Sequence, residues 1–157
     1  MEAFDGCEAL VFVFPLYVDG VPSHLLRLLD DNMNEIVNAS PEAMVYAVVN
    51  NGFYEGRQNA VALEIMRNFC ARSGLRWGQG LGVGAGGMIT AVPVGYGPMK
   101  NLGRMLDLLA RNILHGRTDE DCMFEPNFPK FLYKIAAHMK WRLKAGKNGV
   151  SIAKRMI

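Results

Sequence analysis

The chain has 157 residues, the length of one domain with a buried core. Half of its residues are hydrophobic and 20% are charged, and no apolar run approaches the roughly 18 residues of a membrane span. The acidic start is unlike a secretory leader, and the spacing of Cys7, Cys70 and Cys122 favours reduced structural thiols over a metal site. These features predict a cytoplasmic globular protein.

The charges are distributed unevenly along the chain. From Pro126 onward there are eight Lys or Arg residues and no Asp or Glu. Of the 17 basic and 15 acidic residues in the whole chain, the first 125 residues therefore hold nine and fifteen, a net charge of −6. This pattern indicates an acidic body followed by a basic segment.

Three segments are predicted to be strands. Residues 9–14 (ALVFVF) and 43–49 (AMVYAVV) are apolar without alternation, which is typical of parallel strands buried on both faces. Pro15 ends the first run because proline cannot donate a ladder hydrogen bond. Residues 75–87 (LRWGQGLGVGAGG) form a third, glycine-rich strand that continues into a loop.

Helical spacing separates and follows these strands. Pro22 begins a helix whose leucines supply a buried side, and residues 59–73 repeat apolar side chains every three or four positions. A strongly amphipathic helix runs from Pro98 to Gly116. Residues 118–129 are interpreted as an acidic linker and 130–145 as a basic amphipathic helix, followed by a polar-basic end at 148–157.

The alternation of strands and helices predicts an α/β fold of three layers, a parallel sheet with helices on both faces. No internal repeat divides the chain, so residues 1–157 are interpreted as a single domain. In such sheets, ligands bind at the carboxyl ends of the strands. The loops after residues 14 and 49 are therefore the candidate binding segments.

Both loops carry a family resemblance. The segment 15–30 (PLYVDGVPSHLLRLLD) resembles the loop and helix of flavodoxin-like NAD(P)H-dependent FMN reductases, in which a Pro-x-Tyr loop after the third strand packs beside the flavin ring. The segment 50–59 (NNGFYEGRQN) is similar to the second flavin-facing loop of that family. The order of elements over residues 8–116, about two-thirds of the chain, fits strands three, four and five with their helices.

The resemblance implies a flavin site made of these two loops. Tyr17 would stack on the flavin or, alternatively, cap the core, and the Asn-Asn-Gly turn would contact the ring edge or serve only as a turn. The residues expected to bind the cofactor are Pro15, Leu16, Tyr17, Val18, Asn50, Asn51, Gly52, Phe53 and Tyr54.

The amino-terminal part of the family pattern is missing. A flavodoxin-like chain begins with a strand, a Ser/Thr-rich loop that cradles the FMN phosphate, a helix and a second strand, but only eight residues precede the strand at 9–14. We therefore expect an amino-terminally truncated sheet. In the strand order 2-1-3-4-5, the strand at 9–14 would lie at an edge, so we expect either a longer native protein or a homo-oligomer that covers this edge.

Two further motifs have ordinary interpretations. Gly82-x-Gly84-x-x-Gly87 matches a dinucleotide fingerprint after a strand, but no helix opens at once, which favours a loop whose glycines allow close backbone approach. His24 lies at a helix start and is expected to be exposed rather than to bind a ligand. The basic helix at 130–145 could favour anionic membranes or nucleic acid, but packing on the body or on a neighbouring subunit is the preferred interpretation.

Two functions follow as hypotheses. The resemblance implies an FMN-dependent NAD(P)H oxidoreductase of the flavin or quinone reductase type, with FMN as cofactor, NAD(P)H as co-substrate and a small-molecule electron acceptor. The flavin would carry the chemistry, so no catalytic side chain and no metal are expected. The alternative is a non-catalytic flavodoxin-like interaction module or fragment that does not bind flavin because the phosphate loop is absent.

Overall fold

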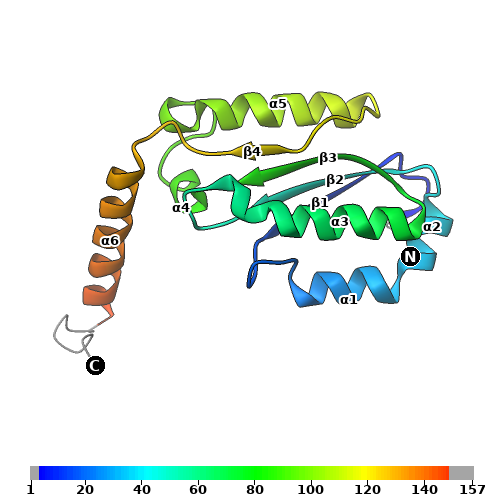
Figure 1. Cartoon of the computed structure of the whole chain (residues 1–157), viewed down its shortest axis with the longest axis horizontal. Coiled ribbons are helices and arrows are strands. Elements are labelled where there is room, and N and C mark those ends of the chain that lie inside the picture. The colour runs from blue at the N-terminus through cyan, green and yellow to red at the C-terminus, as the bar shows by residue number, and fades with distance from the viewer. Residues whose placement is uncertain (1–3, 149–157) are drawn as a thin grey trace. The chain divides into compact units, whose positions relative to one another are not determined.

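The computed structural model describes residues 4–148, so nearly all of the expected polar-basic end lies outside the described residues. The fold is α/β, with a four-stranded parallel sheet in the order β1-β2-β3-β4 and six α-helices (Figure 1). The elements are β1 Ala9–Pro15, α1 Ser23–Asp31, α2 Met33–Ala39, β2 Met44–Asn50, the 3-10 helix η2 Gly56–Asn59, α3 Ala60–Ser73, β3 Arg76–Val83, α4 Gly86–Ile89, the 3-10 helix η3 Gly97–Met99, α5 Lys100–Leu114, β4 Cys122–Phe124 and α6 Lys130–Lys147.

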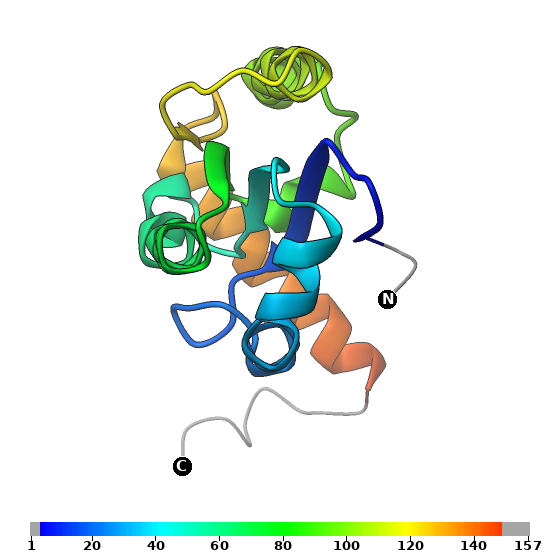
Figure 2. The same cartoon turned by 90° about the vertical axis from the view of Figure 1, so that its right-hand side faces the viewer.

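Helices cover both faces of the sheet, as the alternation of elements predicts. Figure 2 shows the strands nearly end on, with α5 on one side and α1 and α3 on the other. One apolar core joins α1, α2 and α3 to β1 and β2, and a second joins α5 to β2, β3 and β4. Every residue of β2 from Met44 to Val49 except the half-buried Val48 is buried, which confirms the prediction of a central strand.

Strand β1 differs from the prediction that both of its faces are buried. Leu10 and Phe14 point into the core shared with α3, but Val11 is 46% exposed and Val13 is 72% exposed on the opposite face. The reason is the position of α5, whose buried residues pack on β2, β3 and β4. The expected edge position of this strand is confirmed, because β1 pairs only with β2 in the described sheet.

The segment 118–129 contains more than the connection that its composition indicated. Its middle residues, Cys122–Phe124, form β4, which pairs in parallel with β3 from Leu81 to Val83. Phe124 is fully buried beneath α5. Contacts divide the chain into two compact units between Asn127 and Phe128, so the sheet with α1 to α5 and the helix α6 are described separately.

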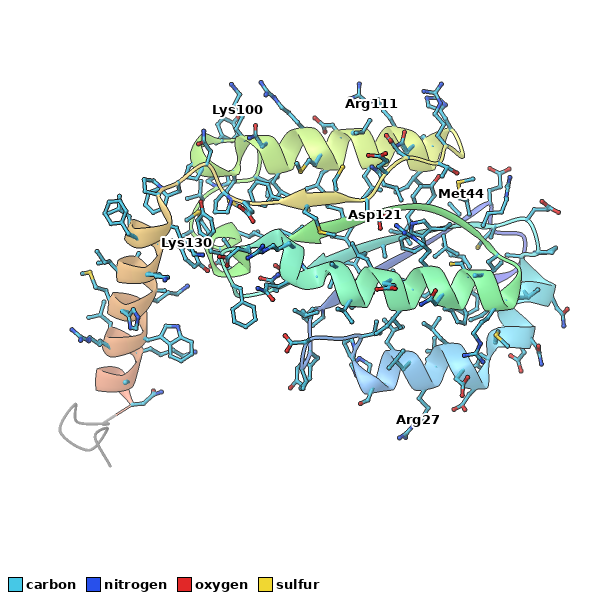
Figure 3. All side chains as sticks on the ribbon, in the orientation of Figure 1. Arg27, Met44, Lys100, Arg111, Asp121 and Lys130 are labelled. Carbon is cyan, nitrogen blue, oxygen red and sulfur yellow. The ribbon has the colours of Figure 1, made fainter. Side chains whose placement is uncertain are left out.

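Asp121 ties the last strand to the rest of the sheet (Figure 3). Its Oδ1 accepts hydrogen bonds from Trp77 Nε1 at 3.0 Å and from the Gly80 backbone N–H at 2.8 Å. Its Oδ2 forms an ion pair with Arg67 on α3. One largely buried carboxylate therefore satisfies donors from β3 and α3 immediately before β4 begins.

A second polar group of contacts fixes the carboxyl end of α5. The buried Gln79 of β3 donates to the Glu120 carbonyl at 2.9 Å and accepts from Asn112 Nδ2 at 2.9 Å. The Tyr46 hydroxyl reaches the carbonyls of Asn112 and Arg117 at 2.9 and 3.0 Å. Burial raises the pKa of this phenol further above the neutral range.

Replacing Asp121 by alanine is expected to lower the free energy of unfolding by about 3 kcal/mol, because the donors of Trp77 and Gly80 would lose their acceptor in a largely buried place. Urea unfolding followed by circular dichroism measures this change. The matched control is Glu120→Ala at the adjacent exposed residue, which should change stability by less than about 0.5 kcal/mol. Equal effects of the two substitutions would contradict the role given to Asp121.

Candidate functional site

The strand ends bring the two predicted binding loops together. Pro15 lies opposite Asn50 in the β1–β2 ladder, and Asn50 lies opposite Val83 in the β2–β3 ladder. The Leu16 N–H donates to the Asn50 carbonyl at 2.8 Å, so the loop after β1 begins beside the loop after β2. The carboxyl edge of the sheet is thus the place where these loops meet, as expected for an open parallel sheet.

The loop after β1 displays an aromatic ring on a tight turn. Tyr17 and Gly20 exchange two backbone hydrogen bonds, each of 3.0 Å. The two residues between them have positive φ, +48° at Val18 and +57° at Asp19, as in the two-residue turns that join hairpin strands. A β-branched residue in this conformation is strained. The turn leaves Tyr17 67% exposed.

The loop after β2 is fixed by hydrogen bonds to its neighbours. The Asn51 N–H donates to the Val83 carbonyl at 2.9 Å, and its Nδ2 donates to the Glu55 carbonyl at 3.1 Å. The Tyr54 hydroxyl donates to the Pro126 carbonyl at 3.0 Å. The backbone is therefore held by β3 and by the segment after β4, while the Phe53 ring remains 56% exposed.

The glycines after β3 allow this loop to lie against the strand. A Cβ on Gly84 would lie 2.6 Å from the Gly56 nitrogen and would collide with the Tyr54 carbonyl. A Cβ on Gly87 would meet no heavy atom within 4 Å. The match to the dinucleotide fingerprint therefore comes in part from backbone packing, as the sequence interpretation favoured. The expectation that no helix opens at once was wrong, because the short helix α4 begins at Gly86.

Three asparagine side chains leave buried acceptors unsatisfied at this edge. Asn50, Asn51 and Asn59 each have a buried Oδ1 without a hydrogen-bond partner among the described residues. The Asn50 amide lies against Gly86, where a Cβ would be 2.7 Å from Nδ2. A buried acceptor without a partner costs about 1–3 kcal/mol, so a ligand that donates a hydrogen bond there would recover this energy.

Asn59 was not among the residues predicted from the sequence. Its Nδ2 donates to the carbonyls of Gly56 and Val83 at 3.0 and 3.2 Å, from the position immediately before α3. Asn59 is the last residue of the segment 50–59 that resembles a flavin-facing loop. It directly precedes a helix, where an asparagine is usually interpreted as a helix cap. No side-chain cap hydrogen bond is formed there, and the amide binds the strand instead.

The carboxyl edge presents two exposed aromatic rings. Tyr17 and Phe53 offer apolar faces to a flat ligand, and the Asn50 Oδ1 is a buried acceptor without a partner among the described residues. The loops at 16–22, 51–55 and 84–97 contain two acids, Asp19 and Glu55, and no Lys or Arg.

The other side chains and cavities that could form a site are His24, the three cysteines and a groove between two helices. His24 is exposed, as expected. All three cysteines are free thiols, and burial raises the pKa of Cys70 to about 12. No group of three or more His, Cys, Asp or Glu side chains within residues 4–148 is placed to hold a metal ion. A groove of about 580 Å³ lies between the carboxyl-terminal halves of α1 and α3, away from the carboxyl edge of the sheet.

Comparison with protein-family models, curated proteins and solved structures found no match to this chain. In the described part of the chain, none of the helices combines the length and apolar character needed to cross a membrane. The inference of function therefore depends on the geometry of the carboxyl edge and on the resemblance of its two loops.

Replacing Gly84 by alanine should lower the free energy of unfolding by about 2–3 kcal/mol, because the added methyl group enters space held by backbone atoms of the neighbouring loop. The control is Gly87→Ala in α4, where the space is open and alanine favours the helix. Thermal unfolding of both variants measures the difference. Similar losses in both would show that Gly84 is not a packing position.

Replacing Val18 by asparagine should raise the free energy of unfolding by about 1 kcal/mol, since asparagine tolerates the left-handed conformation that valine resists. The matched control is Val94→Asn, at an exposed loop valine whose φ is not positive. Urea denaturation compares the two variants. A gain at position 94 as large as that at position 18 would contradict the assignment of strain to this turn.

Proposed function

We propose that the chain binds a flavin through its ring at the carboxyl edge of the sheet and acts as an FMN-dependent NAD(P)H oxidoreductase of the flavin or quinone reductase type. The observation that carries the proposal is the pair of exposed rings, Tyr17 and Phe53, on the two loops that meet at this edge. The unsatisfied Asn50 Oδ1 lies at the end of β2, against Gly86. The parallel sheet and the resemblance of both loops to flavin-facing segments support it.

Each residue has a definite part in this proposal. Tyr17 and Phe53 cover ring faces and exclude water, and Asn50 accepts a hydrogen bond from the imide N–H on the ring edge. Bound flavin would supply the hydride-accepting ring nitrogen, with NAD(P)H as donor and a small molecule as final electron acceptor. The protein would provide orientation, and no side chain is assigned a role in proton transfer.

A second function is favoured by a separate observation. The loops at 16–22, 51–55 and 84–97 have no Lys or Arg for a phosphate, although Arg57 follows in η2, and β1 leaves an apolar edge strand with Val11 and Val13 exposed. Such edges bind other strands or subunits. A flavodoxin-like interaction module that does not bind flavin would have both properties.

Titration with FMN and with riboflavin tests the proposal, using flavin fluorescence and visible absorbance. Because the loops at 16–22, 51–55 and 84–97 have no Lys or Arg for a phosphate, we expect both ligands to bind with dissociation constants within about threefold of each other, a difference under 1 kcal/mol. A large preference for FMN over riboflavin would show that the protein also recognises the phosphate, which would contradict the proposal that only the ring is bound. No binding of either flavin to the folded chain would favour the interaction module.

Side-chain truncation tests the named residues. Tyr17→Ala should weaken flavin binding about tenfold through the loss of stacking. Asn50→Ala should weaken it by a similar factor without lowering stability, because it removes an acceptor that has no protein partner. The control is Leu114→Ala, at an exposed apolar residue at the carboxyl end of α5. Flavin binding that is unchanged by Tyr17→Ala and Asn50→Ala would place the ligand elsewhere.

A further inference from the structure

Strand β1 lies at an edge of the described sheet (Figure 2), where alternate backbone groups face away from β2. On the side toward β2, the Glu8 carbonyl accepts from the Met44 N–H at 3.0 Å, and the Leu16 N–H donates to a β2 carbonyl at 2.8 Å. Alternate residues of a strand bond to the same neighbour, so the even-numbered residues of this segment face β2. The N–H and C=O groups of Val11 and Val13 therefore point outward, and no strand within residues 4–148 pairs with them.

Nothing in the sequence of β1 protects this edge. Residues 9–15 include no Asp, Glu, Lys or Arg, and their ladder with β2 has no bulge. The only proline, Pro15, is the last residue of the strand. Charges, prolines and bulges are the means by which natural edge strands avoid pairing with another chain. With Val11 and Val13 also exposed on one face, β1 is open to a further strand.

The opposite edge of the same sheet is protected. Strand β4 has only three residues, and acidic residues flank it on both sides, at positions 119–121 and 125. A short strand between like charges is a poor template for pairing. The open edge is therefore β1. Its outward N–H and C=O groups select an extended β-strand as their partner, because such a strand presents donors and acceptors at the same spacing.

The sequence of β1 is complementary to itself in an antiparallel pair. With Phe12 of each copy at a two-fold axis, Val11 lies opposite Val13 of the second copy. On the other face, Leu10 lies opposite Phe14. All of these cross-strand pairs are apolar, and no like charges face each other. Because the outward groups belong to the two valines, each valine pair exchanges two backbone hydrogen bonds.

The neighbouring antiparallel registers are less favourable. Sliding the second copy by two residues in one direction would place Glu8 opposite Phe14. Sliding it the other way would place Val11 opposite Pro15, which has no N–H to donate. The register centred on Phe12 lets both valines donate and accept, and it keeps the glutamate away from the apolar pairs.

We propose that two copies of the chain pair through β1 in this antiparallel register and join their four-stranded sheets into one continuous sheet. A two-fold axis makes the two edges equivalent, so the assembly closes at two copies. Pairing of β1 with β4 of another copy would not close and would have to use the protected edge. The dimer extends the second function given above and forms without flavin, so dimerisation and flavin binding can fail separately.

The oligomeric state of the full chain tests this interface, measured by size exclusion with light scattering over a range of concentrations. We expect a dimer, and a dissociation constant raised at least roughly 30-fold in Val13→Lys, which brings two like charges onto one face of the paired strands. The control is Val61→Lys, at an exposed valine of α3, and should remain dimeric. A monomeric unmodified chain, assemblies that grow beyond two copies, or equal effects of the two lysines would overturn the proposal.

A proline substitution separates backbone pairing from side-chain contact. Val13→Pro removes an outward N–H that the ladder with β2 does not use, and proline is tolerated at such edge positions. Each copy then loses one hydrogen bond to the other, so we expect at least about tenfold weaker dimerisation. Val13→Ile retains the N–H and should stay within about threefold of the unmodified chain. A dimer that tolerates proline as well as isoleucine would contradict pairing through the backbone.

Disulfide cross-linking tests the register. Residues that exchange hydrogen bonds in an antiparallel pair have Cα atoms about 5.5 Å apart, which suits a disulfide. Mild oxidation of a mixture of V11C and V13C should therefore give a covalent dimer linked between positions 11 and 13, identified by peptide mass mapping. Each variant alone should cross-link much less, and oxidation of the unmodified chain measures any contribution of its three native thiols. Equal cross-linking of V11C with itself would overturn the register.

Discussion

The close approach of one backbone to another at the carboxyl edge is the constraint on which the candidate site depends. The loop after β2 lies so near β3 that Gly84 and Gly56 cannot have side chains. That contact places Asn51 and Asn59 where their amides donate to carbonyls of neighbouring backbone. A substitution that opens this contact would therefore displace the loop after β2, which carries Phe53.

The layout of the fold could be predicted from the sequence because each central element has a strong periodic pattern. The continuous apolar run of β2 and the three-to-four spacing of α3 and α5 specify both type and burial. Strand β4 could not be found in this way, because three residues between an acidic turn and a proline are too few to show a period. Its position depends on Asp121, whose partners are far away in the sequence.

The burial of β1 shows a second limit of sequence patterns. An apolar run predicts the preference of its side chains for a core, but not whether another element is present to cover them. Val11 and Val13 are as apolar as the buried valines of β2. They are exposed because α5 packs on β2, β3 and β4 and does not cover β1. The position of the loops after β1 and β2 at the carboxyl edge could be predicted from the sequence, whereas the unsatisfied state of the asparagine amides depends on tertiary packing.

The polar contacts around Gln79 and Asp121 also determine the order in which a growing chain can become stable. Ribosomal synthesis delivers β1, β2, α3 and β3 well before residues 112–124. Until that later segment arrives, Gln79, Trp77 and the Gly80 N–H lack the partners that they have in the finished fold. These polar groups of β3 therefore obtain their partners only when the segment that contains β4 has been made.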